Sequence, residues 1–287
     1  MRSETFQTPG QVRTELRVGA GEIRLTSGED GQTIVSLEPL RDNDASREAI
    51  ENARLELRER GGVYEVVAEI RDRGRGFGFS RGAEVRIDVR CPDGTEVDAK
   101  SGSGDIEARG RYGSVEIETG SGDVELDEVG EARVNAASGD ISIRSIGGEA
   151  RINSASGDQR IESVSGDAKL NSASGDVLLR SASGNVEVNS ASGDVTVQEA
   201  RSSVNVNTAS GDQVIGSAVQ GRVNLKSASG DLEIGIREGS TLHVDARSRS
   251  GDVRSDLPVS DTPPEGDAPH IDLRADTMSG DITITRA

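Results

Sequence analysis

The residues with the most regular spacing that could do chemistry are aspartates. Nine Ser-Gly-Asp motifs lie between Ser101 and Asp231, and in all but the one at 165–167 successive glycines are 17 to 19 residues apart. Copies that stack would place these carboxylates in a row, where neighbouring charges about 5 Å apart repel by roughly 1 kcal/mol in water. A calcium ion between them would relieve that repulsion. The weak calcium candidates are Asp140, Asp158, Asp176, Asp194 and Asp212.

The details of the motif argue against calcium. Nonapeptide calcium solenoids carry Gly-Gly-x-Gly-x-Asp-x-apolar-x, whereas here Gly and Asp are adjacent and the second glycine is missing. Calcium takes six to eight oxygen ligands, and one Asp per turn with its neighbouring Ser hydroxyls supplies too few. The simpler interpretation is that Ser and Asp accept backbone N–H bonds in their own turn. We therefore expect no specific metal site and no cofactor.

A second candidate is the segment from Arg71 to Arg81, which alternates arginine and glycine with two phenylalanines. Side chains of this kind can stack on single-stranded nucleic acid. The simpler interpretation is a capping loop whose phenylalanines cover one end of the fold while the arginines neutralise an acidic surface. The residues of this candidate partner-binding loop are Arg73, Arg75, Phe77 and Phe79.

Catalytic chemistry finds little support. His243 and His270 are the only histidines, so a histidine metal site is not expected. Serine is abundant, but no base accompanies it at a recognisable spacing. Asparagine recurs at one position of the repeat. Stacked amide side chains can hydrogen-bond to one another along the axis of the stack, so we expect these asparagines to have a structural role. These asparagines are Asn135, Asn153, Asn171, Asn189 and Asn207. We expect no catalytic residues and no enzyme.

The elements that position these residues come from a nine-residue unit, as in Ser-Ala-Ser-Gly-Asp-Val-Thr-Val-Gln at 190–198. The apolar-polar-apolar run after each Asp is typical of a half-buried strand. The Gly and Asp before it are typical of a turn. Two units return the chain to its start, so the sequence predicts an all-β, single-domain β-solenoid with coils of about 18 residues, each of two short strands. The crossover preference favours a right-handed winding.

Two rows of this repeat bear on its core. A small residue two before each glycine is expected to point inward at a tight corner. These residues are Ala137, Ala155, Ala173, Ala191, Ala209 and Ala228. Gln159 and Gln213 stand where other copies have the first apolar residue, so they either turn outward or form hydrogen bonds inside the core.

The chain outside the regular repeats predicts a cap and a loop. Residues 1–100 read as a lead-in and cap, continuous with the solenoid of residues 101–287. Within the lead-in we expect a short helix over 44–52 with Asp44 or Ser46 as N-cap. A hairpin around Gly61-Gly62 is also expected. Four prolines between 257 and 270 predict a loop before the last Ser-Gly-Asp copy at 279–281.

Composition limits the function classes. Hydrophobic residues make up 32% and aromatic residues 2%, which suits a thin solenoid better than a conventional core. The net charge of −18 argues against a nucleic-acid partner. The single Cys91 excludes an intrachain disulfide, and no apolar run is long enough for a membrane span. Because the first 20 residues lack a signal-peptide pattern, we expect a cytoplasmic protein without membrane insertion.

The repeated Ser-Gly-Asp series, the segment from Leu232 to Leu257 and the final Ser-Gly-Asp-Ile-Thr-Ile-Thr resemble a bacterial β-strand-repeat family. It is the "putative adhesin" family, domain of unknown function 4097, and the resemblance is closest to soluble, actinobacterial-type members. It covers nearly the whole chain. It implies a β-solenoid and, in some members, association with the cell envelope, and it supplies no catalytic residues.

These observations predict a non-enzymatic repeat scaffold or protein-interaction module with an unknown protein partner. A calcium-dependent or envelope-associated adhesin and a carbohydrate-active β-solenoid enzyme are the alternatives. The sequence leaves the oligomeric state and the biological process open.

Overall fold

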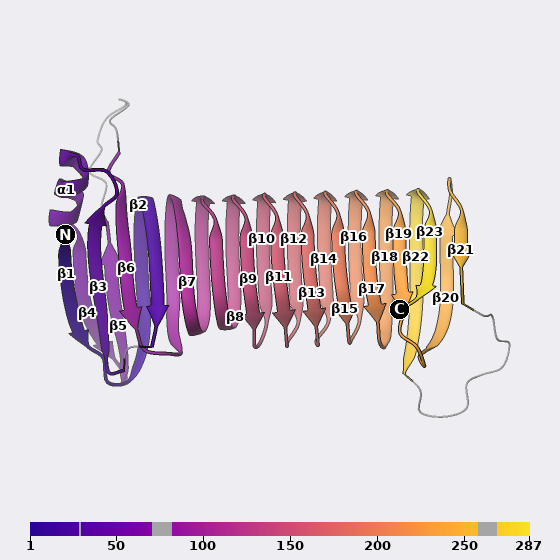
Figure 1. The fold of residues 1–287 in the computed structure, drawn as a ribbon, viewed down its shortest axis with the longest axis horizontal. Coiled ribbons are helices and arrows are strands. Elements are labelled where there is room, and N and C mark those ends of the chain that lie inside the picture. Colours follow the sequence, from indigo (N-terminus) through magenta and orange to yellow (C-terminus); the bar gives the residue numbers. More distant parts are fainter. Residues whose placement is uncertain (29, 71–81, 258–268) are drawn as a thin grey trace. The chain divides into compact units, whose positions relative to one another are not determined.

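The computed structural model describes residues 1–28, 30–70, 82–257 and 269–287. The chain divides into two compact units, Met1–Ser145 and Ile146–Ala287, each built almost entirely of strands (Figure 1). The predicted partner-binding residues Arg73, Arg75, Phe77 and Phe79 lie outside the described residues, as does most of the predicted proline-rich loop.

The second unit contains the most regular repeats. Each coil consists of one seven-residue strand and one six-residue strand joined by a Ser-Gly-Asp turn, and each strand pairs in parallel with the equivalent strand one coil away. Ala168, for example, lies beside Ala150 and Val186, and Val177 lies beside Gln159 and Val195. These strands are β10 (Ala150–Ser156), β11 (Gln159–Val164), β12 (Ala168–Ser174), β13 (Val177–Ala182), β14 (Val186–Ser192), β15 (Val195–Ala200), β16 (Val204–Ser210) and β17 (Gln213–Ala218). The predicted β-solenoid with two strands per coil is confirmed.

Further strands continue this unit towards the carboxyl terminus. They are β18 (Gly221–Ser229), β19 (Leu232–Ile236), β20 (Thr241–Ser248), β21 (Val253–Ser255), β22 (His270–Ser279) and β23 (Ile282–Arg286). The last Ser-Gly-Asp copy belongs to the stack, as predicted, because β22 and β23 pair with β18 and β19.

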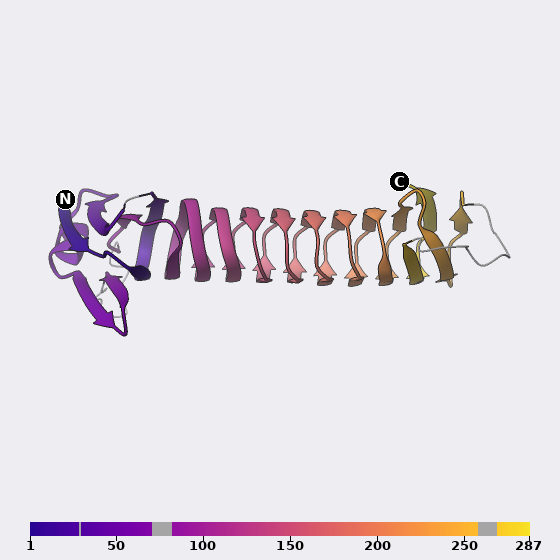
Figure 2. The same cartoon turned by 90° about the horizontal axis from the view of Figure 1, so that it is seen from below.

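The core of this unit lies between the two strands of each coil, which occupy opposite sides of the stack (Figure 2). Along β12 and β13, Ala168, Leu170, Val177 and Leu179 are buried while the residues between them face outward. The period-two alternation therefore places one apolar stripe from each strand inside, as the sequence predicts.

The expected inward alanine row is wrong. Ala155 and Ala173 are exposed, and the buried residues are the serines just before them, Ser154 and Ser172. The inward-facing positions of β10 and β12 are their first, third and fifth residues. The first two are apolar, and the fifth, which is the last inward position, is the serine. Its hydroxyl is satisfied locally, since Ser154 Oγ donates to the carbonyl of Ser156 at 2.9 Å.

Gln159 and Gln213 both point into the core, where each is almost completely buried. Gln159 Nε2 donates to the carbonyl of Asn171 at 2.9 Å, and Gln213 Nε2 donates to the carbonyl of Lys226 at 2.8 Å. The Oε1 atoms of both are buried without a hydrogen-bond partner among the described residues. The open question is thereby settled in favour of hydrogen bonding inside the core.

The first unit mixes parallel and antiparallel pairing. Its strand β2 pairs in parallel with β5, β6 and β7, while β3 pairs antiparallel with β1 and β6. β7 pairs in parallel with β8. The strands are β1 (Arg2–Gln7), β2 (Gln11–Ser27), β3 (Gln32–Pro39), β4 (Arg54–Arg60), β5 (Val63–Glu69), β6 (Val85–Cys91), β7 (Thr95–Ser121), β8 (Val124–Ser138) and β9 (Ile141–Ile146). The predicted hairpin is β4–β5.

The predicted helix is α1 (Asp44–Glu51), but its N-cap differs from the prediction. The Oδ1 of Asn43, one residue earlier than Asp44, accepts the backbone N–H of Ser46 at 2.7 Å. Asn is as good an N-cap as Asp, so composition alone does not place this boundary.

Candidate functional site

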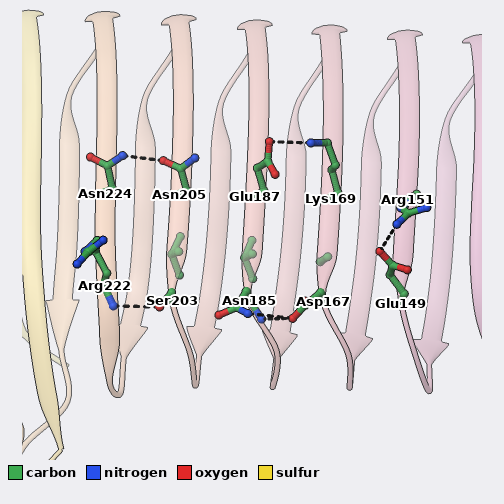
Figure 3. A pocket seen from close by; sticks show the side chains of 13 residues that line it. Glu149, Arg151, Asp167, Lys169, Asn185, Glu187, Ser203, Asn205, Arg222 and Asn224 are labelled. Carbon is green, nitrogen blue, oxygen red and sulfur yellow. Dashed lines mark hydrogen bonds and ion pairs between the residues drawn. The ribbon is translucent and has the colours of Figure 1, made fainter.

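A polar groove runs across five parallel strands of the second unit, on the outward face of β10, β12, β14, β16 and β18 (Figure 3). Its volume is about 550 Å³. The apolar residues that line it, Ala168, Val186 and Val204, have buried side chains. Polar side chains therefore make its surface, namely Glu149, Arg151, Asp167, Lys169, Asn185, Glu187, Ser203, Asn205, Arg222 and Asn224.

The repeat register sets the position of these side chains. Because equivalent strands pair without a shift, Arg151, Lys169 and Glu187 occupy the same position on successive strands. Asn205 and Asn224 continue this row on the next two strands. Neighbouring parallel strands lie about 4.8 Å apart, so this row presents one polar side chain per strand at a constant interval.

Ion pairs and hydrogen bonds hold the groove side chains in place. Lys169 Nζ lies 2.9 Å from Glu187 Oε1, and Arg151 is paired with Glu149 at 2.7 Å. The Lys169 ammonium lowers the pKa of Glu187, with a further hydrogen bond from Asn189 in the same direction. Charges of both signs therefore lie side by side in the groove at neutral pH.

The asparagine row borders the groove and forms the expected ladder. Asn171 Nδ2 donates to Asn153 Oδ1 at 2.8 Å, Asn189 Nδ2 to Asn171 Oδ1 at 3.0 Å, and Asn207 Nδ2 to Asn189 Oδ1 at 3.1 Å. The row therefore ties four successive coils together, which confirms its structural interpretation.

The aspartate row also bonds from coil to coil. Asp158 Oδ1 accepts the backbone N–H of Asp176 at 2.9 Å, and Asp176 Oδ1 accepts that of Asp194 at 2.8 Å. The sequence interpretation, that each Asp accepts a backbone N–H of its own turn, is therefore wrong for these bonds. They join neighbouring coils instead. The described residues include no cluster of three or more His, Cys, Asp and Glu side chains that could hold a metal.

The Asp176→Asn substitution should leave the melting temperature nearly unchanged, because asparagine keeps the Oδ1 acceptor and removes one charge from the row. Asp176→Ala is the matched control, and the lost acceptor should cost about 1 kcal/mol. Thermal melts with chelator and with millimolar calcium test the metal hypothesis. A rise of many degrees in calcium that Asp176→Asn abolishes would contradict our expectation and make this row a cation site.

Three further groups with catalytic potential lie outside the groove, namely His270, Cys91 and Tyr112. His270 Nδ1 lies 2.9 Å from the hydroxyl of Thr241, and this contact is exposed. Burial raises the pKa of Cys91 to about 11, so its thiol stays protonated and unreactive at neutral pH. Burial likewise raises the pKa of Tyr112, whose hydroxyl donates to the carbonyl of Arg109 at 3.0 Å.

The first unit has its own pocket of about 430 Å³ on β2, β3, β6 and β7. Arg24, Arg90 and Arg109 line it together with Glu38, Asp88 and Glu107. Burial raises the pKa of Asp88, and Arg109 is ion-paired with Glu107. Its charges are of mixed sign, as in the groove, but without a repeated register.

Within the part of the chain that the structure describes, no helix has the length and apolar character needed to cross a membrane.

Comparisons with known proteins place the chain in a family. A model of the Toastrack DUF4097 family matches residues 15–217 and 179–285. No curated protein matches. Similar solved structures include a putative adhesin from Bacteroides fragilis, with 15% identity, a TM-score of 0.41, and coverage of 100% of this chain and 96% of that one. A putative lipid binding protein from Parabacteroides distasonis shows 13% identity, a TM-score of 0.41 and the same coverages.

A putative cell adhesion protein from Clostridium sporogenes shows 10% identity and a TM-score of 0.26, with coverage of 100% of this chain and 99% of that one. The matched residues of the family model span nearly the whole sequence and include both the regular repeats and the final Ser-Gly-Asp copy. The chain therefore belongs to the Toastrack DUF4097 family of β-solenoid proteins.

Proposed function

We propose that this chain is a non-enzymatic interaction module that binds an extended protein partner along the groove of its second unit. The observation that carries the proposal is the groove itself, in which five strands present polar side chains in constant register. A partner segment that lies along the groove would meet donors and acceptors at the interstrand interval of about 4.8 Å.

The chemistry of the groove favours a polar partner segment with charges of both signs. Lys169 and Glu187 lie side by side, and Arg222 is paired with Asp272 at 3.4 Å. Complementary charges of this kind give specificity and fast association more than affinity. The apolar lining residues are buried, so polar side chains and their aliphatic stems make the exposed surface of the groove.

An experiment on the groove charges tests this function. The double variant Arg151→Glu/Lys169→Glu reverses two charges inside the groove. Arg160→Glu/Arg180→Glu makes the same change of charge on β11 and β13, where both arginines are exposed outside the groove. Proteins captured from an extract of the native cells by each immobilised variant are compared with those captured by the unmodified chain.

We expect the groove variant to lose its partner while the control variant keeps it, because only the first change places like charges against the partner segment. Circular dichroism checks that both variants keep their strand content. Equal capture by the two variants would place the partner elsewhere and contradict the proposed groove.

A further inference from the structure

The order of strands in space differs from their order in the chain at the end of the second unit. β22 pairs with both β18 and β20, and β23 pairs with both β19 and β21. The last two strands of the sequence are therefore inserted between two earlier coils, as the yellow strands in Figure 1 show. The outermost coil of this unit is formed by β20 and β21, and each of these strands has one pairing partner among the described strands.

This outermost coil leaves apolar side chains uncovered. Val244 is 41% exposed and Val253 is 47% exposed, although their register partners Leu273 and Ile282 are completely buried. These valines continue the buried stripes of the inner coils, and no further coil covers them among the described residues. An open edge of this kind is a template for pairing with another chain.

The backbone of the coil is also open on that side. Thr241 and Arg249 donate their N–H groups to the carbonyls of Pro269 and Thr277, on the side of β22. Because backbone directions alternate along a strand, Val244 and Ala246 present their N–H groups to the open side. On β21, Asp256 donates its N–H to Ile284, so by the same alternation Val253 faces the open side.

On each strand, a residue that faces the open edge has an aspartate before it and an arginine after it. This pattern is complementary to itself when two copies pair in antiparallel orientation. Ala246 stands between Asp245 and Arg247, and Val253 stands between Asp252 and Arg254. In an antiparallel pair centred on Ala246, Asp245 of each copy lies opposite Arg247 of the other. A pair centred on Val253 likewise opposes Asp252 and Arg254. Each of these arginines already reaches its own aspartate, at 3.1 Å and 2.7 Å.

We propose that the β20–β21 edge is a docking surface for a second copy of this chain, joined end to end about a two-fold axis. Such an axis reverses the direction of the strands, so β20 meets β20 of the second copy in antiparallel orientation. The surface is separate from the groove and does not depend on its function. The mirrored Asp and Arg pattern favours a second copy over an unrelated partner, because only a copy offers the same sequence in reverse.

The charges also select the register. A pair centred on Asp245 would oppose two aspartates, and like charges directly opposite each other are destabilising. Centring on Ala246 instead makes the Ala246 pair hydrogen-bonded and brings the flanking Asp and Arg side chains into the closer, non-hydrogen-bonded positions. The apolar side chains on the inner face, including Val244, are then covered by the second copy.

A charge-exchange experiment tests the proposal on the full chain. Sedimentation velocity over a concentration series should show a dimer of the unmodified protein. Arg247→Asp and Asp245→Arg should each weaken the homodimer at least tenfold, because like charges then meet across the axis. A one-to-one mixture of the two variants should form a heterodimer, since the two acidic side chains that flank Ala246 in the first variant then face the two basic side chains of the second.

Two further variants separate docking from folding. Val244→Lys places a charge on the uncovered apolar stripe and should abolish the dimer. Met278→Lys is the control, because Met278 is 56% exposed but lies on β22, which is paired on both sides. A protein that stays monomeric at all concentrations, a dimer that Val244→Lys leaves unchanged, or a mixture that fails to associate would each overturn the proposal.

Discussion

Gly175→Ala is expected to lower the free energy of unfolding of the second unit by about 2–6 kcal/mol, because two costs add at this turn. The backbone of Gly175 has a φ of +115°, as the turn chemistry predicts, and a residue with a side chain is strained there by about 1–3 kcal/mol. The added Cβ would also lie 2.3 Å from the carbonyl oxygen of Gly157 on the preceding coil. Forcing an atom into a packed site costs about 1–3 kcal/mol.

Urea unfolding followed by circular dichroism measures this effect. Gly19→Ala, in the first unit, is the control for the same substitution without strain, since a Cβ at Gly19 meets no atom within 4 Å and its φ is outside the left-handed region. The control should be neutral or slightly stabilising, because alanine reduces the freedom of the unfolded chain. Equal midpoints for both variants would mean that the turn relaxes and that the contact with Gly157 is not rigid.

The contact of Gly175 with the preceding coil shows that the same residues determine both the turn and the stacking of the coils. The position needs glycine for its backbone angle and again for the close approach of Gly157. The adjacent Asp176 then donates its N–H to Asp158 across the same gap. Local turn preference and packing between coils therefore agree, which is the condition under which a repeat sequence predicts its own fold.

The strand order at the carboxyl end could not be predicted. The final Ser-Gly-Asp copy at 279–284 indicates that the last strand belongs to the stack, and the structure confirms it as β23. The copy does not show which coil that strand joins. Leu232 and Val253 are both apolar residues at the same phase, and Ile282 pairs with both, so the insertion depends on tertiary packing.

The phase of the inner row could not be predicted for a related reason. Ser154 and Ala155 are both small, and size alone does not show which one faces inward. Burial of the serine is tolerated because its hydroxyl bonds to the carbonyl of Ser156 at 2.9 Å. A polar residue with a local partner can therefore occupy a core position.

The candidate groove has a signal in the sequence that is easily missed. The regular Ser-Gly-Asp copies draw attention to the strands that follow them. The groove lies on the other strand of each coil, which follows a less regular copy of the motif, as at Gly148, Gly166 and Gly184. Aligning Arg151, Lys169 and Glu187 as equivalent positions would have shown the row of charges. The sequence could not show that these side chains border an open groove, because that depends on the neighbouring surface.

Leu179→Ala should lower the free energy of unfolding by about 3 kcal/mol, while Leu178→Ala, one residue earlier, should cost less than about 1 kcal/mol. Leu179 is completely buried between its register partners Ile161 and Val197, so its loss leaves a cavity in a closely packed stripe. Leu178 points outward, beside Arg160 and Thr196. The two variants remove the same atoms from opposite faces of one strand.

This pair tests the register of the solenoid as well as the strength of its core. A shift of one residue exchanges the inward and outward faces of a strand, so it would exchange the two costs. Equilibrium unfolding in urea, with both variants compared at the same denaturant slope, gives the difference directly. Equal costs, or a larger cost for Leu178→Ala, would show that β13 does not place Leu179 in the core, and the equivalent stripes on the neighbouring coils would then need to be reassigned with it.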